Sequence, residues 1–457
     1  MRKYNGFEDL LRDFETNDPE ADALLQSKGG MKTAVSRKEF AFMARERAKE
    51  LTQDKCTCLG ILCDGSLECV LTIFGSALSG KQTVLLNENV PDKLLGEQIA
   101  HTDIDALWGD PDLVDELSCH LTPGLKTPEE AEQGRHRILF FTSGTTAGSK
   151  AVMLTDCSLM AAAYNGSCML PLRKDDILMC MLPLDHVFGM VCSLLWAMQC
   201  GAAAALGRGM RYYTQDLSFF SPTVLSAVPS LLEFLLAQNL INPQLRLVLV
   251  GAGDCPRSVL EQAASLGLKI SFGYGLTETS SGVAISCGGD PYALDVCPED
   301  TVTLASDGEI LVSSESCMMQ GYYKLPEETA SVLKDGVLYT GDLGKWDGEG
   351  RLHIIGRKKE ILVLKDGTKI FLPEYEARLL KVLPGKDFAV LAAEGRPVLL
   401  ICAKKEEKDR IREAIRPVMN TLPRSQQISG IFTITQALPK TASGKLMRWA
   451  LQKLILN

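Results

Sequence analysis

The chain has 457 residues, of which 46% are hydrophobic and 23% charged. This balance is typical of globular proteins and excludes disordered, collagen-like and fibrous chains. The length exceeds one ordinary domain of about 150 residues, and the net charge of −9 argues against a general nucleic-acid-binding surface.

Apolar runs bounded by turn residues predict strands at residues 58–62, 83–86, 137–141, 177–182, 223–228 and 245–250. Helical patterns at residues 70–78, 158–163 and 229–238 lie between several of them. Continuous apolar strands that alternate with helices are typical of a parallel sheet covered on both faces. After residue 293 the strands become shorter, with tight turns predicted at residues 306–309 and 346–350.

The last hundred residues return to mixed strands and helices. We expect strands at residues 360–364, 388–392 and 398–403, then a charged helix at 405–416 that Pro417 stops. The predicted fold class is α/β: a large N-terminal domain, residues 1–357, of layered α/β sheets with a β-rich subdomain. A small C-terminal α+β domain, residues 358–457, completes it.

Charge supports this division. Residues 358–457 carry 19 Lys and Arg against 10 Asp and Glu, whereas residues 1–357 carry 29 against 47. A basic piece beside an acidic body is consistent with an anionic ligand between two domains, or with two independently solvated surfaces.

Cysteine usage and the N-terminal residues bear on the cell compartment. Fifteen cysteines show no zinc-site spacing, and residues 1–15 are charged where a secretory leader would be apolar. Free thiols without a leader predict a cytoplasmic protein. Residues 187–206 are uncharged and long enough to span a membrane, but Gly189 and Gly201 interrupt them. We therefore expect a buried helix that runs into a buried strand, and no integral membrane segment.

A loop rich in hydroxyls and glycine follows the strand at 137–141. Small residues let backbone N–H groups approach a phosphate, hydroxyls donate further hydrogen bonds, and a lysine adds charge. The spacing is not that of a Walker loop, and a polar surface turn is the alternative. The candidate residues are Thr142, Ser143, Gly144, Thr145, Thr146 and Lys150.

A second segment, residues 271–279, reads Ser-Phe-Gly-Tyr-Gly-Leu-Thr-Glu-Thr. Tyr274 could stack on a nucleobase, while Thr277 and Glu278 could meet a phosphate and its Mg²⁺. A tight strand exit is the other interpretation. Nearby, residues 251–253, Gly-Ala-Gly, follow an apolar strand but lack the third glycine of a dinucleotide fingerprint.

Two further segments complete the set. Asp342 follows a glycine and could accept hydrogen bonds from a ribose diol, and Arg357 could contact sugar or phosphate. Lys445 lies in a Ser-Gly-Lys loop near the C-terminus. A turn aspartate, a basic surface strand and a solvated lysine are the alternatives.

Together and in this order, these segments resemble the AMP-forming acyl-CoA synthetase, luciferase and peptide-synthetase adenylation superfamily, over about residues 36–448. The resemblance is greatest to acyl-CoA synthetases. Residues 182–189, Leu-Pro-Leu-Asp-His-Val-Phe-Gly, are similar to their acyl-site segment, and residues 356–364 to the hinge segment of long-chain members. The phosphate loop departs from the family pattern, with Ala147 where glycine is usual and Ser149 where proline is usual.

The resemblance implies a role for each candidate. The loop from Thr142 to Lys150 would hold the ATP β- and γ-phosphates. The adenine would lie between residues 251–253 (Gly251, Ala252, Gly253) and Tyr274–Gly275, and Asp342 and Arg357 would contact the ribose. Thr277 would contact the α-phosphate and Glu278 would bind Mg²⁺. His186 and Gly282 would border the acyl site, Lys359 would be the hinge, and Lys445 would bridge the carboxylate and the α-phosphate.

The activity implied is that of a ligase. A carboxylic acid, fatty or otherwise apolar, would react with ATP to give acyl-AMP and pyrophosphate, and then with CoA to give acyl-CoA and AMP. ATP, Mg²⁺ and CoA are the expected cofactors. The alternatives are a freestanding adenylation enzyme that loads a separate acyl carrier protein, and a catalytically weak relative that binds nucleotide or acyl ligand.

Overall fold

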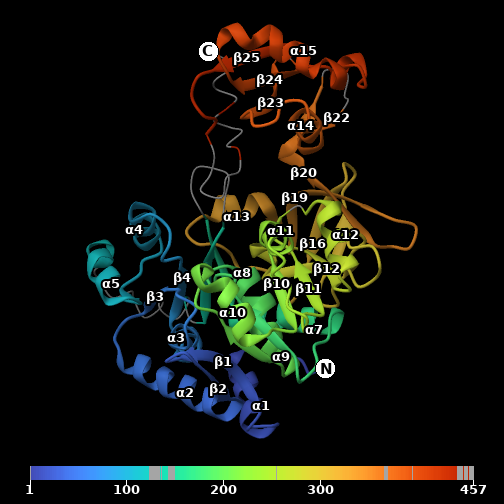
Figure 1. Cartoon of the computed structure of the whole chain (residues 1–457). Coiled ribbons are helices and arrows are strands. Elements are labelled where there is room, and N and C mark those ends of the chain that lie inside the picture. The colour runs from blue at the N-terminus through green and yellow to red at the C-terminus, as the bar shows by residue number, and fades with distance from the viewer. Residues whose placement is uncertain are drawn as a thin grey trace.

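The computed structural model describes residues 2–122, 134, 136–142, 150–253, 255–364, 369–393, 395–439, 446 and 451. Its elements form a large lower body and a smaller block that contains the C-terminal strands (Figure 1). The α-helices in these ranges are α1 (Phe7–Thr16), α2 (Arg37–Gln53), α3 (Leu67–Leu78), α4 (Asp92–His101), α5 (Pro111–Leu117), α7 (Asp156–Met169), α8 (Val187–Gly189), α9 (Trp196–Cys200), α10 (Tyr213–Phe220), α11 (Pro229–Ala237), α12 (Arg257–Ser265), α13 (Pro326–Val332), α14 (Leu372–Leu380) and α15 (Lys408–Met419).

A nine-stranded sheet forms one layer of the body within these ranges. Its order is β14 (Asp295–Val296), β13 (Ser281–Ile285), β12 (Lys269–Leu276), β11 (Leu247–Val250), β10 (Val224–Ala227), β8 (Ile177–Cys180), β9 (Ala203–Leu206), β1 (Asp22–Lys28) and β2 (Met31–Ser36). The central strands pair in parallel, as the apolar runs predict. The hairpin β1–β2 extends one edge, with β1 parallel to β9, and the antiparallel β13 and β14 extend the other.

A six-stranded sheet forms the second layer. Its order is β17 (Gly321–Tyr322), β7 (Ala151–Thr155), β6 (Arg137–Phe141), β4 (Gln82–Leu86), β3 (Cys58–Leu62) and β5 (Ala106–Trp108). The two sheets share one hydrophobic core, to which Phe140 of β6, Leu159 of α7 and Leu178 of β8 all contribute. Thr155 caps α7 by accepting a hydrogen bond from the Ser158 amide, so the helix begins directly at the end of β7.

Short antiparallel strands follow, as the tight turns predict. β15 (Thr301–Leu304), β16 (Glu309–Ser313), β19 (Val337–Trp346) and β18 (Leu333–Lys334) form a sheet in that order, and β20 (Leu352–Arg357) also pairs with β19. The chain then forms a two-stranded sheet of β21 (Ile361–Val363) and β22 (Lys369–Phe371).

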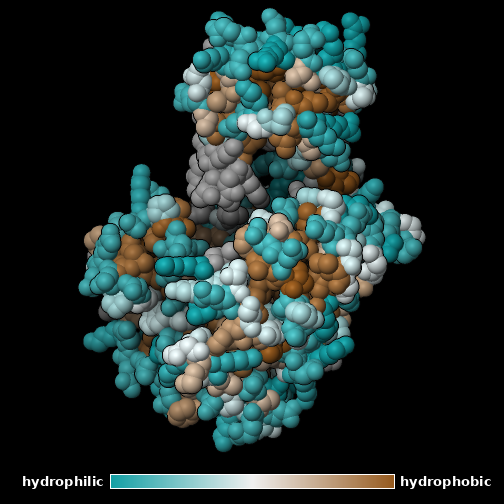
Figure 2. Space-filling model, in the orientation of Figure 1, coloured by the Kyte–Doolittle hydropathy of each residue, from teal (hydrophilic) through white to brown (hydrophobic). Residues whose placement is uncertain are grey.

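The C-terminal block has its own core. Its sheet contains β23 (Phe388–Ala393), β24 (Arg396–Cys402) and β25 (Gly430–Ile434), covered by α14 and α15 (Figure 1). On the face of the molecule that Figure 2 shows, a hollow lies between this block and the larger body. The architecture is therefore the expected α/β class, with a β-rich part and a smaller α+β part.

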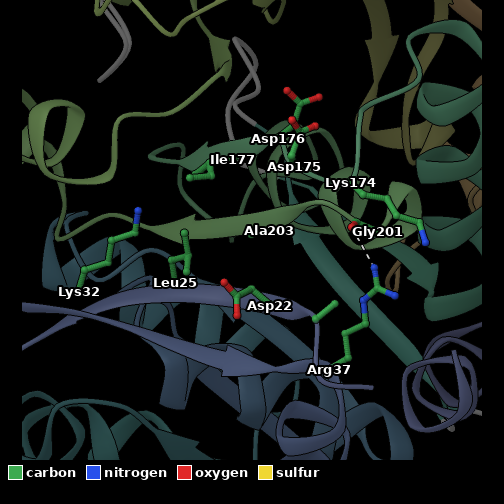
Figure 3. Close-up of a pocket in the computed structure, with 11 residues that line it drawn as sticks. Asp22, Leu25, Lys32, Arg37, Lys174, Asp175, Asp176, Ile177, Gly201 and Ala203 are labelled. Atoms are coloured by element: carbon green, nitrogen blue, oxygen red, sulfur yellow. Dashed lines mark hydrogen bonds between the residues drawn. The ribbon is translucent and has the colours of Figure 1, made fainter. Parts of the chain in front are cut away.

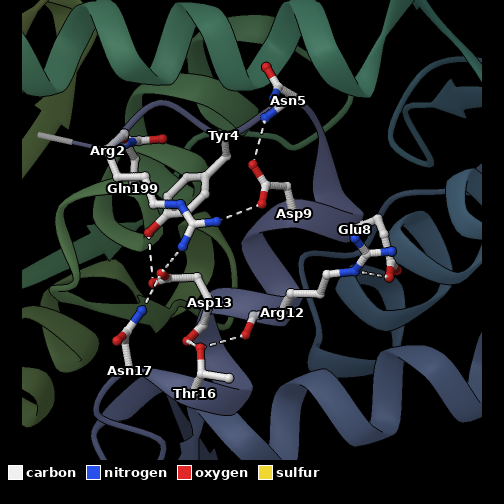
Figure 4. Close-up of polar contacts among 10 residues, drawn as sticks. All are labelled: Arg2, Tyr4, Asn5, Glu8, Asp9, Arg12, Asp13, Thr16, Asn17 and Gln199. Atoms are coloured by element: carbon white, nitrogen blue, oxygen red, sulfur yellow. Dashed lines mark hydrogen bonds and ion pairs between the residues drawn. The ribbon is translucent and has the colours of Figure 1, made fainter.

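The N-terminal residues are bound to the body by polar contacts (Figure 4). The Arg2 guanidinium donates to Asp13 at 2.6 Å and to Asp9 at 2.8 Å, and the Tyr4 hydroxyl donates to Asp13 at 2.8 Å. Gln199 of α9 donates to the Arg2 carbonyl at 2.6 Å. These bonds fix α1 against a helix almost two hundred residues away in the chain.

The uncharged segment 187–206 forms a buried helix that runs into a buried strand, as expected. The helix is α-helical in α8, π-helical in η2 (Met190–Leu195) and α-helical again in α9, and Gly201, with φ of 74°, ends it before β9. In the part of the chain that the structure describes, no helix is both long and apolar enough to cross a bilayer.

The predicted end of the charged helix is wrong. Pro417 lies inside α15, which continues to Met419. Pro417 has no N–H to donate, so the helix loses one backbone hydrogen bond there, and only two residues follow it in α15. Ile415 and Met419, four residues apart, are buried in the core of the C-terminal block, and their burial favours the extra turn.

Candidate active site

The candidate residues lie where strands of both layers end. β6 leads to Thr142, β11 to Gly251, and β12 to Thr277 in the 3₁₀ turn η4 (Thr277–Thr279). Ligands of open α/β sheets bind beyond the carboxyl ends of the strands. The candidate site has the position that this rule predicts.

Tyr274, Asp342 and Arg357 are in direct contact. The Tyr274 hydroxyl donates to Asp342 Oδ2 at 2.9 Å, and Arg357 Nε lies 3.1 Å from Asp342 Oδ1. Asp342 and Arg357 are also register partners in β19 and β20. Burial and then the nearby Asp342 charge raise the pKa of Tyr274 well above its ordinary value, so the hydroxyl remains a donor.

Only part of this cluster faces solvent. The Asp342 side chain is 6% exposed, whereas the Arg357 side chain is 61% exposed. A hydroxyl-bearing ligand could reach the carboxylate where the arginine now covers it.

Gly275 permits the sharp hairpin between β12 and β13. A Cβ on Gly275 would lie 1.8 Å from the Ser281 carbonyl oxygen, so only glycine fits. The pairing shifts register between Tyr274 and Gly275, and Gly275 faces Gly282 across the two strands. Tyr274 and Thr277 thus lie close to the turn at the carboxyl end of β12.

Thr142 and Lys150 bracket the predicted phosphate loop. The Thr142 amide donates to the Lys150 carbonyl at 2.9 Å, and the Lys150 amide donates to Thr142 Oγ1 at 3.3 Å. The two ends of the loop are therefore adjacent. Four predicted phosphate ligands, Ser143, Gly144, Thr145 and Thr146, lie outside the described residues, as do Ala147, Ser149 and Lys445.

Tyr322 connects two predicted site residues and was not predicted from the sequence. Its hydroxyl donates to Glu278 Oε1 at 2.7 Å, and Lys150 Nζ lies 4.4 Å from its ring centroid. The sequence around it, Gly-Tyr-Tyr, contains no pattern of a ligand site. Its position depends on β17, which pairs with β7 across more than 160 residues of chain.

Residues 251–253 approach the segment that follows His186. A Cβ on Gly251 would lie 3.1 Å from the Phe188 ring, and Ala252 adopts a left-handed φ of 62°. α8 begins after His186 and contacts β13, the strand that carries Gly282. Burial lowers the pKa of His186 and raises that of Asp185, although each charge would favour the other.

An apolar cavity lies behind Gly282. It is lined by Ala162, Ala163, Gly166, Leu170, Val191, Cys192, Trp196, Leu249, Gly282 and Ile285. Its volume is about 10 Å³, about enough for one water molecule. Trp196 is held in the wall by a 3.1 Å hydrogen bond from its indole N–H to the Leu170 carbonyl.

A larger cavity, of about 260 Å³, lies at the other end of the nine-stranded sheet (Figure 3). Ile177 and Ala203, at the amino ends of β8 and β9, line it, and Arg37 donates to the Gly201 carbonyl at 2.9 Å beside it. Acidic and basic side chains are mixed around its rim. It is not part of the candidate site, which lies at the carboxyl ends of the strands.

Lys359 lies in η5 (Lys358–Glu360), between β20 and β21, and is exposed. The preceding residue is anchored, because Lys358 Nζ lies 2.6 Å from Asp307 Oδ2 and 2.9 Å from Glu309 Oε2. Phe371 of β22 packs against Gly356, where a Cβ would lie 2.2 Å from its ring. The residues that flank Lys359 thus have defined partners.

The chain is similar to known proteins in sequence and in fold. The 2-succinylbenzoate–CoA ligase of Bacillus cytotoxicus is 26% identical over 438 residues, which cover 87% of this chain and 88% of that protein. Two solved structures share the fold. The O-succinylbenzoate coenzyme A synthetase (MenE) of Bacillus subtilis, in complex with ATP and magnesium ion, has a TM-score of 0.77 at 22% identity and covers 97% of this chain and 99% of that one.

The second structure is the anthranilate CoA ligase AuaEII in complex with anthranoyl-AMP. Its TM-score is 0.78 at 19% identity, and the match covers 99% of this chain and 98% of that one. Residues 11–323 match the AMP-binding enzyme family, which is more than half of the chain. The chain belongs to the AMP-binding enzyme family.

Proposed function

We propose that this protein is an ATP-dependent ligase that converts a carboxylic acid to acyl-AMP and then to its CoA thioester. The observation that carries the proposal is the position of two clusters at the carboxyl end of β12. Tyr274, Asp342 and Arg357 form one, and Glu278, Tyr322 and Lys150 form the other. The first suits a nucleoside and the second suits a polyphosphate.

The nucleoside cluster would bind adenosine. Tyr274 would flank the adenine opposite residues 251–253, and Asp342 would accept hydrogen bonds from the ribose hydroxyls after the exposed Arg357 side chain turns aside. A carboxylate is well suited to this because it only accepts hydrogen bonds, and hydroxyls donate them.

The second cluster would bind the phosphates. Lys150 and the hydroxyls of the loop that begins at Thr142 would contact the β- and γ-phosphates, and Thr277 the α-phosphate. Glu278 fits Mg²⁺, because this ion is usually held by one or two carboxylates together with substrate phosphates. The bound ion would neutralise phosphate charge. Lys445 would add positive charge where the acid attacks the α-phosphate.

The cavity behind Gly282 would receive the acyl group. Because its volume is only about 10 Å³, side chains must move to admit any acid, and a long alkyl chain would have to displace Trp196. The relatives named above are ligases of succinylbenzoate and anthranilate, which are aromatic acids, and they give no support to our expectation of a fatty acid. We therefore propose an aromatic carboxylic acid as the substrate.

The second half-reaction would use the C-terminal block. We propose the division into residues 1–357 and 358–457, with Lys359 as the pivot that lets one chain present two sets of residues in turn. CoA is the proposed acceptor, since the relatives named above are CoA ligases. A separate acyl carrier protein is the alternative acceptor that the same adenylate could serve.

Pyrophosphate release with a panel of acids tests the proposal. The panel should contain 2-succinylbenzoate, benzoate, anthranilate, octanoate and palmitate, each with and without CoA. We expect release with an aromatic acid and a CoA thioester as the product when CoA is present. Release that depends only on fatty acids would reject the aromatic substrate, an adenylate without thioester would favour the carrier protein, and no release with any acid would reject ligase activity.

A further inference from the structure

The chain segment 319–323 joins the two layers of the body beside the candidate site. The Met319 amide donates to the Glu278 carbonyl at 2.9 Å, on the side of the nine-stranded sheet. The Tyr323 amide donates to the Ala151 carbonyl at 2.8 Å, on the side of the six-stranded sheet. The backbone of this segment is therefore fixed at both ends.

Tyr322 is held tightly within the segment. Its amide donates to Thr329 Oγ1 at 2.9 Å, and Gly321 before it has φ of 135°, a conformation that favours glycine. The Tyr322 residue is 6% exposed. Its ring and hydroxyl consequently have little freedom to move.

The two ends of the Tyr322 side chain contact groups of opposite charge. The hydroxyl donates to Glu278 Oε1 at 2.7 Å, and Lys150 Nζ lies 4.4 Å from the ring centroid, within cation–π range. One rigid side chain thus contacts one charged group from each sheet.

We propose that Tyr322 is a positioning residue that holds the Glu278 carboxylate and the Lys150 ammonium in place for Mg²⁺-ATP. The inference rests on the proposed function, because it assigns Glu278 to the metal ion and Lys150 to the phosphates. A carboxylate held by a fixed donor loses less rotational freedom when the ion binds. The aromatic ring likewise keeps the lysine near the loop that it ends.

Calorimetric titration of the full-length protein with ATP, with Mg²⁺ and in EDTA, tests the two contacts separately. It requires no acid substrate. Tyr322→Phe removes the hydroxyl and keeps the ring. ATP affinity should increase with Mg²⁺ concentration. We expect the Mg²⁺ concentration that gives half of this increase to be about tenfold higher in the variant, the usual scale for a hydrogen bond to a charged group. ATP affinity measured in EDTA should stay unchanged.

Tyr322→Leu removes the ring as well. Affinity for ATP in EDTA should then fall a few-fold, in addition to the altered Mg²⁺ dependence. The matched control is Tyr323→Phe, since the neighbouring Tyr323 hydroxyl donates to Asp103 at 2.9 Å, outside the site. We expect neither quantity to change in this control.

Two results would overturn the role of Tyr322. One is an unchanged Mg²⁺ dependence in Tyr322→Phe while Glu278→Gln shifts it. The other is an equal loss of ATP affinity with and without Mg²⁺ in Tyr322→Phe, which would indicate a structural role alone. The proposed function would instead be rejected if the wild-type protein binds Mg²⁺-ATP but releases no pyrophosphate with any acid. The binding titrations would still test the role of Tyr322 in that case.

Discussion

The Tyr274 hydroxyl donates a 2.9 Å hydrogen bond to the Asp342 carboxylate, although 68 positions separate the two residues in the chain. Tyr274 belongs to the nine-stranded sheet and Asp342 to the antiparallel sheet that contains β19, so the bond joins two sheets. Both residues are buried. The predicted adenine and ribose contacts therefore form one unit rather than two separate ones.

Tyr274→Phe should raise the KM for ATP about tenfold with little change in kcat. The lost hydrogen bond has a charged acceptor, and such bonds contribute about 1.5–3 kcal/mol. Initial rates of pyrophosphate release against ATP concentration measure the effect. Tyr375→Phe is the control, because that hydroxyl donates to the Gln426 carbonyl in the C-terminal block. A fall in kcat alone would place Tyr274 outside ATP binding.

Gly275→Ala should destabilise the body by about 1–3 kcal/mol or more, because its Cβ would collide with the Ser281 backbone. Gly282→Ala is the matched variant, since its nearest neighbour would lie at an ordinary 3.7 Å. We expect Gly282→Ala to unfold like the wild type in denaturant but to change which acids are accepted. Equal unfolding midpoints for both variants would contradict this assignment.

The stability of the protein should depend on Asp300 between about pH 4 and pH 7. Burial raises the pKa of Asp300 from 3.8 to about 7, despite a hydrogen bond from Asn165. Below this window both folded and unfolded chains hold the proton. Within it only the folded chain keeps the proton, so stability falls as the pH rises, by on the order of 4 kcal/mol in total.

Asp300→Asn should remove this pH dependence and stabilise the protein at pH 8. Denaturant unfolding at a series of pH values measures it, with the exposed Glu315→Gln as the control. If the slope between pH 4 and pH 7 survives in Asp300→Asn, another group is responsible.

Lys445→Ala should reduce acyl-AMP formation by about 10²–10³-fold, the usual cost of one contact made in the transition state. Conversion of supplied acyl-AMP to the CoA thioester should remain largely intact, because that step has no need of a lysine at the α-phosphate. Single-turnover assays of each half-reaction separate the two, with Lys405→Ala as a surface control. Equal loss in both would contradict the pivot at Lys359.

Local sequence predicted the strands of the parallel sheet because each consists of apolar residues between turn residues. The run at 247–250, Leu-Val-Leu-Val, is fully buried in β11. The local sequence does not show which distant strands pair with one another. The hairpin β1–β2 joins β9 through pairing between residues 180 positions apart, and no local pattern encodes that choice.

The site shows the same contrast between local pattern and placement. Tyr274, Asp342 and Lys150 stand in recognisable motifs, and Arg357 lies beside Asp342 as expected. The contact between Tyr274 and Asp342 was not predicted, because it joins strands of two different sheets. Tyr322 was missed because its contacts depend on which strand β17 pairs with. The extra turn of α15 was missed because burial of Met419 outweighs the effect of Pro417.

The ion pairs of Lys358 limit where the proposed rotation between residues 1–357 and 358–457 can begin. Arg357 is fixed by the β19–β20 register and Lys358 by Asp307 and Glu309, so the proposed pivot, Lys359, is the first residue after these two anchors. A rotation there would leave Asp342 in place while Phe371 separates from Gly356. The nucleoside could then remain bound through both half-reactions, with only the groups around the acyl phosphate exchanged.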